Sequence, residues 1–355
     1  MRLLVTGGAG FIGSCFVRKV LARTAAAEAV TVLDALTYAG NLENLDAVKP
    51  LATTGRYRFV HGSICDPQAV DDAAEGCDAI INFAAETHVD RSIEDPGAFL
   101  ATNIDGPRVL MDVARQRGCR YVQVSTDEVY GSLGSKGLFS EVSPLDPSSP
   151  YAASKAAGDL LVGAYVRTYG LDAVITRCGN NYGPRQFPEK LIPLFITNAL
   201  DDRELPLYGD GLNVRDWIHV EDHCEAIRVV LEQGVAGAVY NISACDERTN
   251  REVCDRILAA FAKPESLVRY VEDRPGHDRR YALDATRIRT ELDWSPRISF
   301  EDGLTSTLDW YRDNRPWWER VKSGEYRGYY DRLYGRRLAE ARPDVEAADE
   351  GGSDD

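Results

Sequence analysis

The chain of 355 residues is 44% hydrophobic and 27% charged, which is an ordinary composition for a globular protein with a sizeable core. Its formal net charge of −15 repels phosphate backbones and anionic lipids, so the composition disfavours nucleic-acid binding and membrane binding as main roles. The eight cysteines are scattered without a C-x-x-C pair, and no apolar run has the length of a signal peptide or a membrane span, so we expect reduced thiols and a cytoplasmic location.

Short apolar runs rich in β-branched residues alternate with helix-length segments over residues 1 to about 180. This alternation predicts a parallel sheet with helices on both faces, and the right-handed crossover rule makes it a doubly wound α/β (Rossmann) fold. The predicted strands are residues 3–5, 30–33, 57–60, 79–83, 121–125 and 173–176.

Proline and glycine divide the chain into shorter elements after about residue 180. We expect residues 181–320 to form a smaller, mixed α/β C-terminal domain that binds the substrate, with some chain crossing back to residues 1–180. The end of the chain, residues 341–355, is acidic and glycine-rich, which predicts a disordered tail.

The first predicted strand leads directly into glycines at positions 7, 10 and 13, and a helical pattern begins there. Such glycines allow a tight turn and let the backbone approach a pyrophosphate at the helix N-terminus. A turn without a ligand is the alternative for a glycine triplet alone. The second strand, however, ends at Asp34, whose carboxylate can accept hydrogen bonds from both ribose hydroxyls and repels a 2′-phosphate. Because Ala35-Leu36-Thr37 supplies no cation, the sequence favours NAD over NADP.

Tyr151 and Lys155 are spaced by one helical turn and share a helix face. An ammonium beside a phenol favours the phenolate, so we expect Lys155 to lower the pKa of Tyr151 and to prepare it for taking a proton from a sugar hydroxyl. The spacing alone is also common on solvated helix faces. The catalytic interpretation of this pair is supported by Thr126-Asp127-Glu128 at the end of the fifth strand, because ligands bind at the carboxyl ends of such strands.

Two other patterns are set aside. His219 and His223 have the spacing of a metal pair, but Val220 stands where a zinc-protease motif needs glutamate, so no metal is expected. The tryptophans at 310, 317 and 318 are expected to be packing residues.

These motifs resemble the extended short-chain dehydrogenase/reductases. The resemblance narrows to the dTDP-glucose 4,6-dehydratases through Thr126-Asp127-Glu128, Asn180-Asn181-Tyr182-Gly183-Pro184, Pro188-Glu189-Lys190-Leu191-Ile192-Pro193 and Asp273-Arg274-Pro275-Gly276-His277-Asp278. It implies a bound NAD, a dTDP-glucose substrate and a three-stage reaction. In that reaction Tyr151 takes the 4-OH proton during C4 oxidation, Glu128 removes the C5 proton, and Asp127 protonates the leaving 6-hydroxyl.

The resemblance also implies which residues contact the ligands. The expected cofactor contacts are Gly7, Gly10, Phe11, Ile12, Gly13, Asp34, Leu36, Thr37, Ser63, Ile64, Phe83, Ala84, Ala85, Thr102, Tyr151, Lys155 and Asn181. The expected substrate contacts are Thr87, Thr126, Asn180, Lys190, Leu191, Pro206, Tyr208, Arg215, Asn250, Arg274 and His277. Taken singly, Arg215 and Arg274 could instead form surface salt bridges.

The sequence departs from the family pattern at Ser63, where aspartate is usual, and at Arg185, where an aromatic residue or histidine is usual. Two alternatives to the dehydratase stay open. One is another NAD-dependent sugar-nucleotide dehydratase or 4-epimerase, for example on UDP-glucose, and the other is a non-catalytic NAD-binding regulator. The resemblance further implies a homodimer that pairs the Tyr151 helix and the helix near residues 109–117 with their symmetry mates. Val109, Leu110 and Val113 at helical spacing are consistent with a buried face there, although that face can equally pack on its own sheet.

Overall fold

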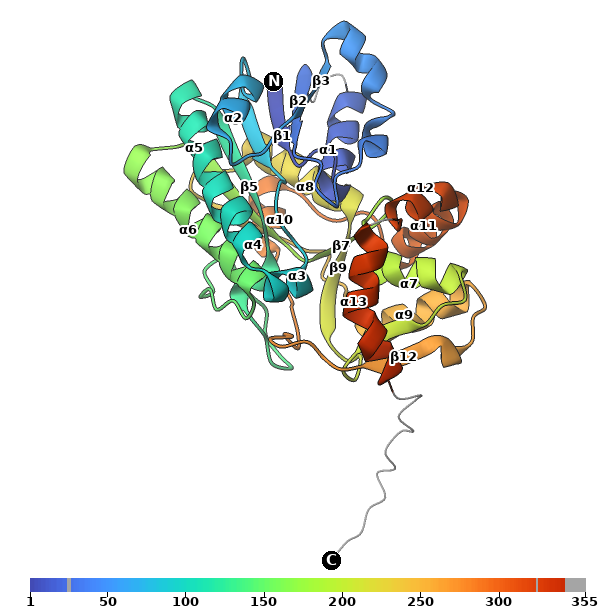
Figure 1. The fold of residues 1–355 in the computed structure, drawn as a ribbon. Helices are drawn as coiled ribbons and strands as arrows, with labels where there is room; N and C mark the ends of the chain where they lie inside the picture. Colours follow the sequence, from blue (N-terminus) through green and yellow to red (C-terminus); the bar gives the residue numbers. More distant parts are fainter. Residues whose placement is uncertain (24–26, 324, 342–355) are drawn as a thin grey trace, which may run out of the picture. The chain divides into compact units, whose positions relative to one another are not determined.

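The computed structural model describes residues 1–23, 27–323 and 325–341 (Figure 1). It divides into two compact units, each made from several stretches of chain. Unit 1 comprises residues 1–187, 214–248 and 278–307. Unit 2 comprises residues 188–213, 249–277 and the segment from 308 onward. The acidic tail predicted for residues 341–355 lies, apart from Ala341, outside the described residues.

Unit 1 is built on a seven-stranded sheet in the order β10-β6-β5-β4-β1-β2-β3, and every pair of neighbours is parallel. This confirms the predicted doubly wound fold. The chain order reverses between β1 and β4, the point at which such sheets open a crevice for ligands. The strands are β1 Arg2–Thr6, β2 Ala29–Asp34, β3 Tyr57–His61, β4 Ala79–Asn82, β5 Arg120–Thr126, β6 Ala173–Cys178 and β10 Val239–Ile242.

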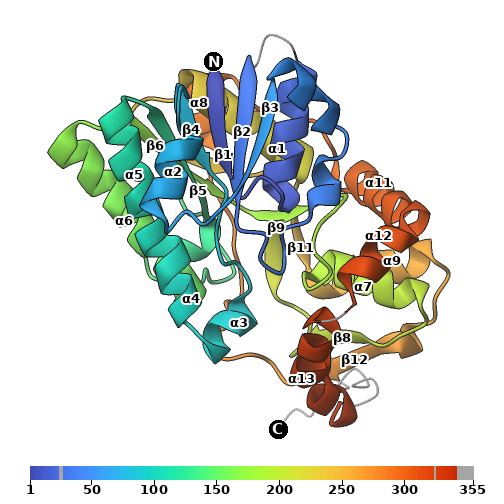
Figure 2. The ribbon, with the colours of Figure 1, turned by 45° about the horizontal axis from the view of Figure 1, so that its top comes forward.

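Helices cover both faces of this sheet (Figures 1 and 2). On one face a hydrophobic cluster joins the sheet to α1 (Phe11–Ala22), α8 (Val220–Gln233) and α10 (Thr286–Leu292). On the other face a second cluster joins it to α2 (Pro67–Ala73), α5 (Gly106–Arg117) and α6 (Pro150–Tyr169). Leu3 and Val5 belong to the first cluster and Leu4 to the second, as the alternation of side chains along a strand requires.

Shorter elements complete unit 1. A three-stranded sheet has the order β11-β9-β7, in which β7 and β9 are parallel. The remaining elements of this unit are β7 Asn180–Tyr182, β9 Val214–His219, β11 Glu247–Thr249, α3 Val89–Glu94, α4 Gly97–Leu100, the π-helix Ala101–Asp105 and the 3-10 helices Leu42–Leu45, Lys49–Thr54 and Asp127–Tyr130, with β11 ending at the unit boundary.

Unit 2 contains a parallel two-stranded sheet, β12-β8, and several helices. Its tryptophans pack as expected: Trp310 and Trp317 meet edge to face with 5.0 Å between ring centroids, and Trp318 Nε1 donates to the Tyr311 carbonyl. Its elements are α7 Leu191–Leu200, β8 Leu205–Tyr208, α9 Asn250–Ala260, the 3-10 helix Glu265–Leu267, β12 Val268–Val271, α12 Arg315–Val321 and α13 Glu325–Ala339. Helix α11, Phe300–Asp313, runs from unit 1 into unit 2.

The sequence predicted a second domain over residues 181–320 with some chain crossing back to the first, and the two units are indeed built from interleaved stretches of chain. Residues 214–248 and 278–307 fall in unit 1, because β10 completes the large sheet beside β6 and α8 and α10 cover that sheet. The segment from residue 308 to the last described residue falls in unit 2 instead. Propensity does not show which segments cross back, since β10 is a short strand whose partner β6 lies far away in sequence. Within the described part of the chain, no helix combines the length and apolarity needed to cross a bilayer.

Candidate active site

The glycine-rich turn between β1 and α1 depends on glycine at two positions. Gly7 has a φ of 65°, and a Cβ on it would lie 2.6 Å from the backbone nitrogen of Ala84. A Cβ on Gly13 would overlap the carbonyl oxygen of Gly7. The turn therefore brings the start of α1 close against β1 and the end of β4.

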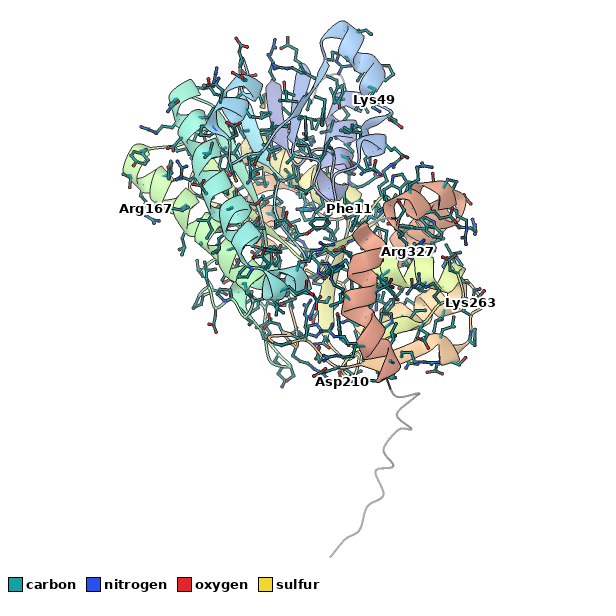
Figure 3. All side chains as sticks on the ribbon, viewed as in Figure 1. Phe11, Lys49, Arg167, Asp210, Lys263 and Arg327 are labelled. Atoms are coloured by element: carbon teal, nitrogen blue, oxygen red, sulfur yellow. The ribbon has the colours of Figure 1, made fainter. Side chains whose placement is uncertain are left out.

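Helix α1 begins at Phe11 (labelled in Figure 3), with Gly10 as its N-cap and no side chain capping it. The N-cap glycine therefore offers no side-chain acceptor to the amide groups of the first turn, and the helix dipole favours an anion there. A phosphate group is the kind of ligand that such a terminus binds.

Asp34, at the end of β2, is held against this turn. Its two carboxylate oxygens accept hydrogen bonds of 2.8 Å each, one from the amide of Ala9 and one from the amide of Leu36. Burial raises the pKa of Asp34, while the two amide hydrogen bonds oppose that rise. The carboxylate is therefore fixed at the position that the sequence assigned to ribose recognition.

Most of the other candidate cofactor residues follow the carboxyl ends of neighbouring strands. Among them, the Ser63 hydroxyl accepts a hydrogen bond of 3.1 Å from the Cys65 amide, so it is engaged in its own turn. The set comprises Leu36 and Thr37 after β2, Ser63 and Ile64 after β3, Phe83, Ala84 and Ala85 after β4, Asn181 on β7, and Thr102 in the π-helix.

Thr126, Asp127 and Glu128 sit where β5 turns into a 3-10 helix of four residues. Thr126 caps that helix by accepting from the Glu128 amide at 3.2 Å, and its hydroxyl donates to Asp127 Oδ1 at 3.1 Å. This local capping explains why the three residues stand together at the carboxyl edge of the sheet.

Asp127 is only 2% exposed, and its second oxygen, Oδ2, is buried without a hydrogen-bond partner among the described residues. Burial raises the pKa of Asp127 well above its usual value, and the neighbouring carboxyl groups of Glu128 and Asp216 raise it further. A protonated carboxyl group relieves both effects, so the environment favours the protonated form of Asp127.

Helix α6 carries Tyr151 and Lys155. It starts behind Ser149, whose hydroxyl accepts from the Ala152 amide at 3.1 Å, and Pro150 takes the first helical position. Lys155 Nζ donates to the Val124 carbonyl on β5 at 2.8 Å, which ties the helix to the strand that ends in Thr126.

Burial raises the pKa of Tyr151 well above its usual value, and the charge of Glu128 adds to the rise, while a hydrogen bond from Thr126 opposes it. The expectation that Lys155 lowers this pKa overall is therefore wrong for this structure, because burial and the carboxylate dominate. Burial also lowers the pKa of Lys155, an effect that Asp159 opposes.

Three further groups surround these residues, and the sequence analysis missed them. Asp159 lies one turn beyond Lys155 on α6 and forms a buried ion pair with Arg177 at 2.8 Å. Its spacing from Lys155 was a usable signal. Asp216 on β9 and Tyr281 interact electrostatically with Asp127 and Glu128 respectively, and burial raises the pKa of Asp216 to about 6. Neither carries a local sequence signal.

Arg215 lies in this group and does not form the surface salt bridge considered as an alternative. It is 5% exposed, its guanidinium donates to the carbonyls of Val214 and Asp278 at 2.8 and 2.9 Å, and it lies over the Tyr281 ring at 4.4 Å. It also interacts electrostatically with Asp127. The structure thus brings a second predicted substrate residue, after Thr126, close to the carboxyl pair.

Asn180, Asn181 and Arg185 follow β6. Asn181 Oδ1 lies 2.8 Å from Nδ1 of His223, so that histidine orients an amide, and His219 caps α8 by accepting from the Glu221 amide. Arg185 has a left-handed backbone with a φ of 70°. Burial lowers the pKa of Arg185, and the nearby Arg18 lowers it further. Nothing in the structure explains why arginine stands at this position.

The other predicted substrate residues except Thr87, which follows β4, belong to unit 2. His277 Nδ1 lies 2.5 Å from Asp273 Oδ1, and its ring meets the Tyr208 ring edge to face at 6.0 Å between centroids. Asn250 opens α9 behind a capping box formed by Thr249 and Glu252. Lys190 precedes α7 and Leu191 begins it, Pro206 lies on β8, and Arg274 follows Asp273.

A doubly wound sheet with an uncapped helix at a glycine turn, a fixed Asp34 and a Tyr-Lys pair beside a carboxyl pair defines a dinucleotide-dependent enzyme of the short-chain dehydrogenase/reductase type. Comparison with known proteins narrows this class. The family model described as GDP-mannose 4,6 dehydratase matches residues 4–307. A dTDP-glucose 4,6-dehydratase of Streptomyces niveus is 57% identical over 327 residues, covering 91% of this chain and 96% of that protein.

Solved structures agree with this match. DesIV of Streptomyces venezuelae, a dTDP-glucose 4,6-dehydratase crystallised with NAD and TYD, superposes with a TM-score of 0.88 at 55% identity, over 91% of this chain and all of that one. A UDP-glucose 4-epimerase of Thermus thermophilus in complex with NAD reaches a TM-score of 0.81 at 34% identity, over 88% of this chain and all of that one. This chain belongs to the dTDP-glucose 4,6-dehydratase family.

Proposed function

We propose that this protein converts dTDP-D-glucose into dTDP-4-keto-6-deoxy-D-glucose and water, using NAD as a cofactor that is not consumed overall. The observation that carries the proposal is Asp127, a buried carboxyl group beside Glu128 and Tyr151, one of whose oxygens has no hydrogen-bond partner in the described part of the chain. Epimerisation at C4 needs no proton donor for a leaving hydroxyl, whereas elimination of water from C5 and C6 needs both a base and an acid. The membership in the dehydratase family supports the same conclusion.

NAD fits the residues present. The uncapped start of α1 suits its pyrophosphate, and the fixed Asp34 carboxylate suits the ribose hydroxyls. Tyr151, Lys155 and Asn181 are further residues proposed to contact NAD. When bound, NAD supplies a reversible store for one hydride, which leaves C4 of the sugar and later returns to C6.

The chain's own groups move the protons. Tyr151 accepts the proton of the 4-hydroxyl as C4 is oxidised, and the resulting ketone acidifies the hydrogen on C5. Glu128 removes that proton, and Asp127 donates its proton to the 6-hydroxyl, which departs as water. After hydride reaches C6, Glu128 returns a proton to C5. Tyr151 then releases to solvent the proton that it took from the 4-hydroxyl, and Asp127 takes up a proton from solvent to replace the one that it donated. The sum is the loss of one water from the sugar.

The remaining candidate residues are proposed to hold the nucleotide and the sugar. Thr87 and Thr126 would contact the sugar hydroxyls, and Arg215 would bind a phosphate oxygen or the sugar beside the carboxyl pair. An arginine fork matches phosphate oxygens well. The further substrate residues are Asn180, Lys190, Leu191, Pro206, Tyr208, Asn250, Arg274 and His277.

We also propose that the protein works as a cytoplasmic homodimer paired through α5 and α6. The apolar side chains that suggested this, Val109, Leu110 and Val113, are already buried in the cluster against the chain's own sheet, so they do not support pairing. Support comes instead from Leu160 on α6, which is 62% exposed. The cytoplasmic location is supported by eight cysteines that form no disulfide.

One incubation tests the proposed reaction. The protein is mixed with dTDP-glucose or with UDP-glucose, and 4-keto sugar is read by its ultraviolet absorbance in alkali. We expect product from dTDP-glucose without accumulation of free NADH. Formation of a C4 epimer without loss of water, or stoichiometric release of NADH, would contradict the proposal.

A further inference from the structure

Three segments of unit 1 that are remote in sequence meet through their side chains beside the cofactor turn. The guanidinium carbon of Arg91, on α3, lies 4.0 Å from the centroid of the Tyr38 ring. The Tyr38 ring meets the Phe187 ring edge to face at 5.6 Å between centroids. These three residues, Tyr38, Arg91 and Phe187, are called the clasp below.

The sheet order shows what the clasp spans. Tyr38 follows β2, Arg91 follows β4, and β1 lies between those two strands. The segments after β2 and β4 both leave the carboxyl edge of the sheet, so their contact has to cross the end of β1. The glycine turn and the start of α1 lie at that end of β1, where a pyrophosphate would bind.

Hydrogen bonds tie the segments that carry Tyr38 and Arg91 to the glycine turn and to helix α6, respectively. The Asn41 amide and the Asn44 side-chain nitrogen both donate to the Ala9 carbonyl of the glycine turn, at 3.1 and 3.0 Å. Between Asp34 and Asn41, the Gly40 amide donates to the Thr37 carbonyl at 3.0 Å, which closes a turn with Tyr38 next to its tip.

On the other side, helix α3 is tied to the catalytic helix, because the Tyr151 amide donates to the Ser92 hydroxyl at 3.2 Å. Arg91, the preceding residue, therefore extends from a support that also positions Tyr151.

We propose that the clasp of Tyr38, Arg91 and Phe187 retains NAD in the crevice, by closing the carboxyl edge of the sheet over the end of β1. An enzyme that returns its hydride to the same sugar gains from holding one dinucleotide through many turnovers. The contacts suit a closure that can open and re-form, since a guanidinium over a phenol ring and an edge-to-face ring pair are each modest and reversible. The inference rests on the NAD dependence proposed above.

The test measures how fast the dinucleotide leaves. NAD-free protein is loaded with NADH, mixed with excess NAD, and the loss of bound-NADH fluorescence is followed. Tyr38→Leu and Arg91→Gln should each release NADH roughly 3- to 30-fold faster than the natural protein, the range expected from a cation–π contact. The double variant should release NADH no more than about twice as fast as the faster single variant, because both substitutions remove the same contact between Arg91 and Tyr38.

Two matched controls separate retention from general loss of structure. Tyr38→Phe keeps the ring and should keep the natural release rate. Arg287→Gln removes a similar contact, in which the guanidinium carbon lies 5.0 Å from the ring centroid of Tyr240 on β10, an edge strand of the sheet separated from β4 by β5 and β6. It should leave the release rate unchanged. If Tyr38→Leu does not fold, the comparison of Arg91→Gln with Arg91→Lys decides, and only the former should release NADH faster.

Unchanged release from Tyr38→Leu and Arg91→Gln would overturn the clasp, as would fully additive effects in the double variant. A failure of the proposed function is distinguishable. If the natural protein binds no NADH at all, the cofactor assignment is wrong and the clasp falls with it. If the natural protein retains NADH and the variants retain it equally, only the clasp is wrong.

Discussion

At the residue scale, one buried environment determines how two proton-transfer groups behave. Burial raises the pKa of both Asp127 and Tyr151, yet the proposed reaction needs the first protonated and the second ionised. Motif spacing in the sequence predicted Tyr151 as a proton acceptor, and the family resemblance implied the proton-donor role of Asp127; both roles remain predictions. Sequence reasoning misjudged the pKa of Tyr151, because the cost of burying a phenolate depends on packing that no motif records.

These pKa directions predict opposite pH responses for the two stages. A group whose pKa is raised loses its proton only at higher pH, so C4 oxidation by Tyr151 should become faster as the pH rises from neutral into the alkaline range. Elimination requires protonated Asp127, so it should persist above the usual carboxyl range and slow as the pH rises through the raised pKa. Stopped-flow absorbance of bound NADH measures both rates at each pH. Parallel pH profiles for formation and decay of NADH would contradict this assignment.

The buried ion pair of Asp159 and Arg177 predicts a large effect on stability. Asp159→Asn leaves a buried guanidinium without its counter-charge, which typically costs about 3–5 kcal/mol in the free energy of unfolding. Asp172→Asn, which breaks the more exposed pair with Arg120, is the control and should cost about 0–1 kcal/mol. Urea denaturation gives both values. Equal losses in the two variants would show that burial of the pair is not what stabilises the protein.

At the element scale, the N-cap of α6 links helix stability to catalysis. Ser149→Ala removes the acceptor for the Ala152 amide, which should cost about 0.5–2 kcal/mol and also loosen the first turn that carries Tyr151. Asp284→Ala removes the acceptor for the Thr286 amide at the start of α10 and serves as the control. We expect a similar loss of stability from both, but a lower turnover rate only from Ser149→Ala. Equal turnover rates would mean that the cap does not position Tyr151.

At the scale of the whole molecule, the first half of the fold was predictable and the second half was not. The strands from β1 to β6 can be recognised in the sequence as apolar runs. The glycines and Asp34, which indicate the cofactor site, lie directly at the ends of such runs. The return of the chain to complete the large sheet with β10 pairs residues 64 positions apart, such as Val239 and Ile175, which no local pattern encodes. For the same reason, the sequence could not predict that Asp216 and Tyr281 lie near the carboxyl pair, because only the tertiary structure brings them there.

The proposed homodimer is tested at this scale. Leu160→Glu places a charge on the exposed outer face of α6, the helix whose far end carries Arg167 (Figure 3), and should convert the dimer to monomers in sedimentation velocity at micromolar protein. The matched control, Val235→Glu, changes an exposed apolar residue that follows α8 and should leave the dimer intact. A monomeric mass for the natural protein would reject the dimer.

The measurement that most directly tests the account is a single turnover with dTDP-glucose, followed by absorbance of bound NADH, for Tyr151→Phe and Asp127→Asn. Loss of a positioned acid or base slows its step roughly 10²–10⁴-fold. Tyr151→Phe should therefore show almost no NADH, whereas Asp127→Asn should form NADH and lose it slowly, because oxidation proceeds and departure of the 6-hydroxyl does not. Product formation by Asp127→Asn at the natural rate would contradict the acid assignment, and absence of NADH in that variant would contradict the separation of oxidation from elimination.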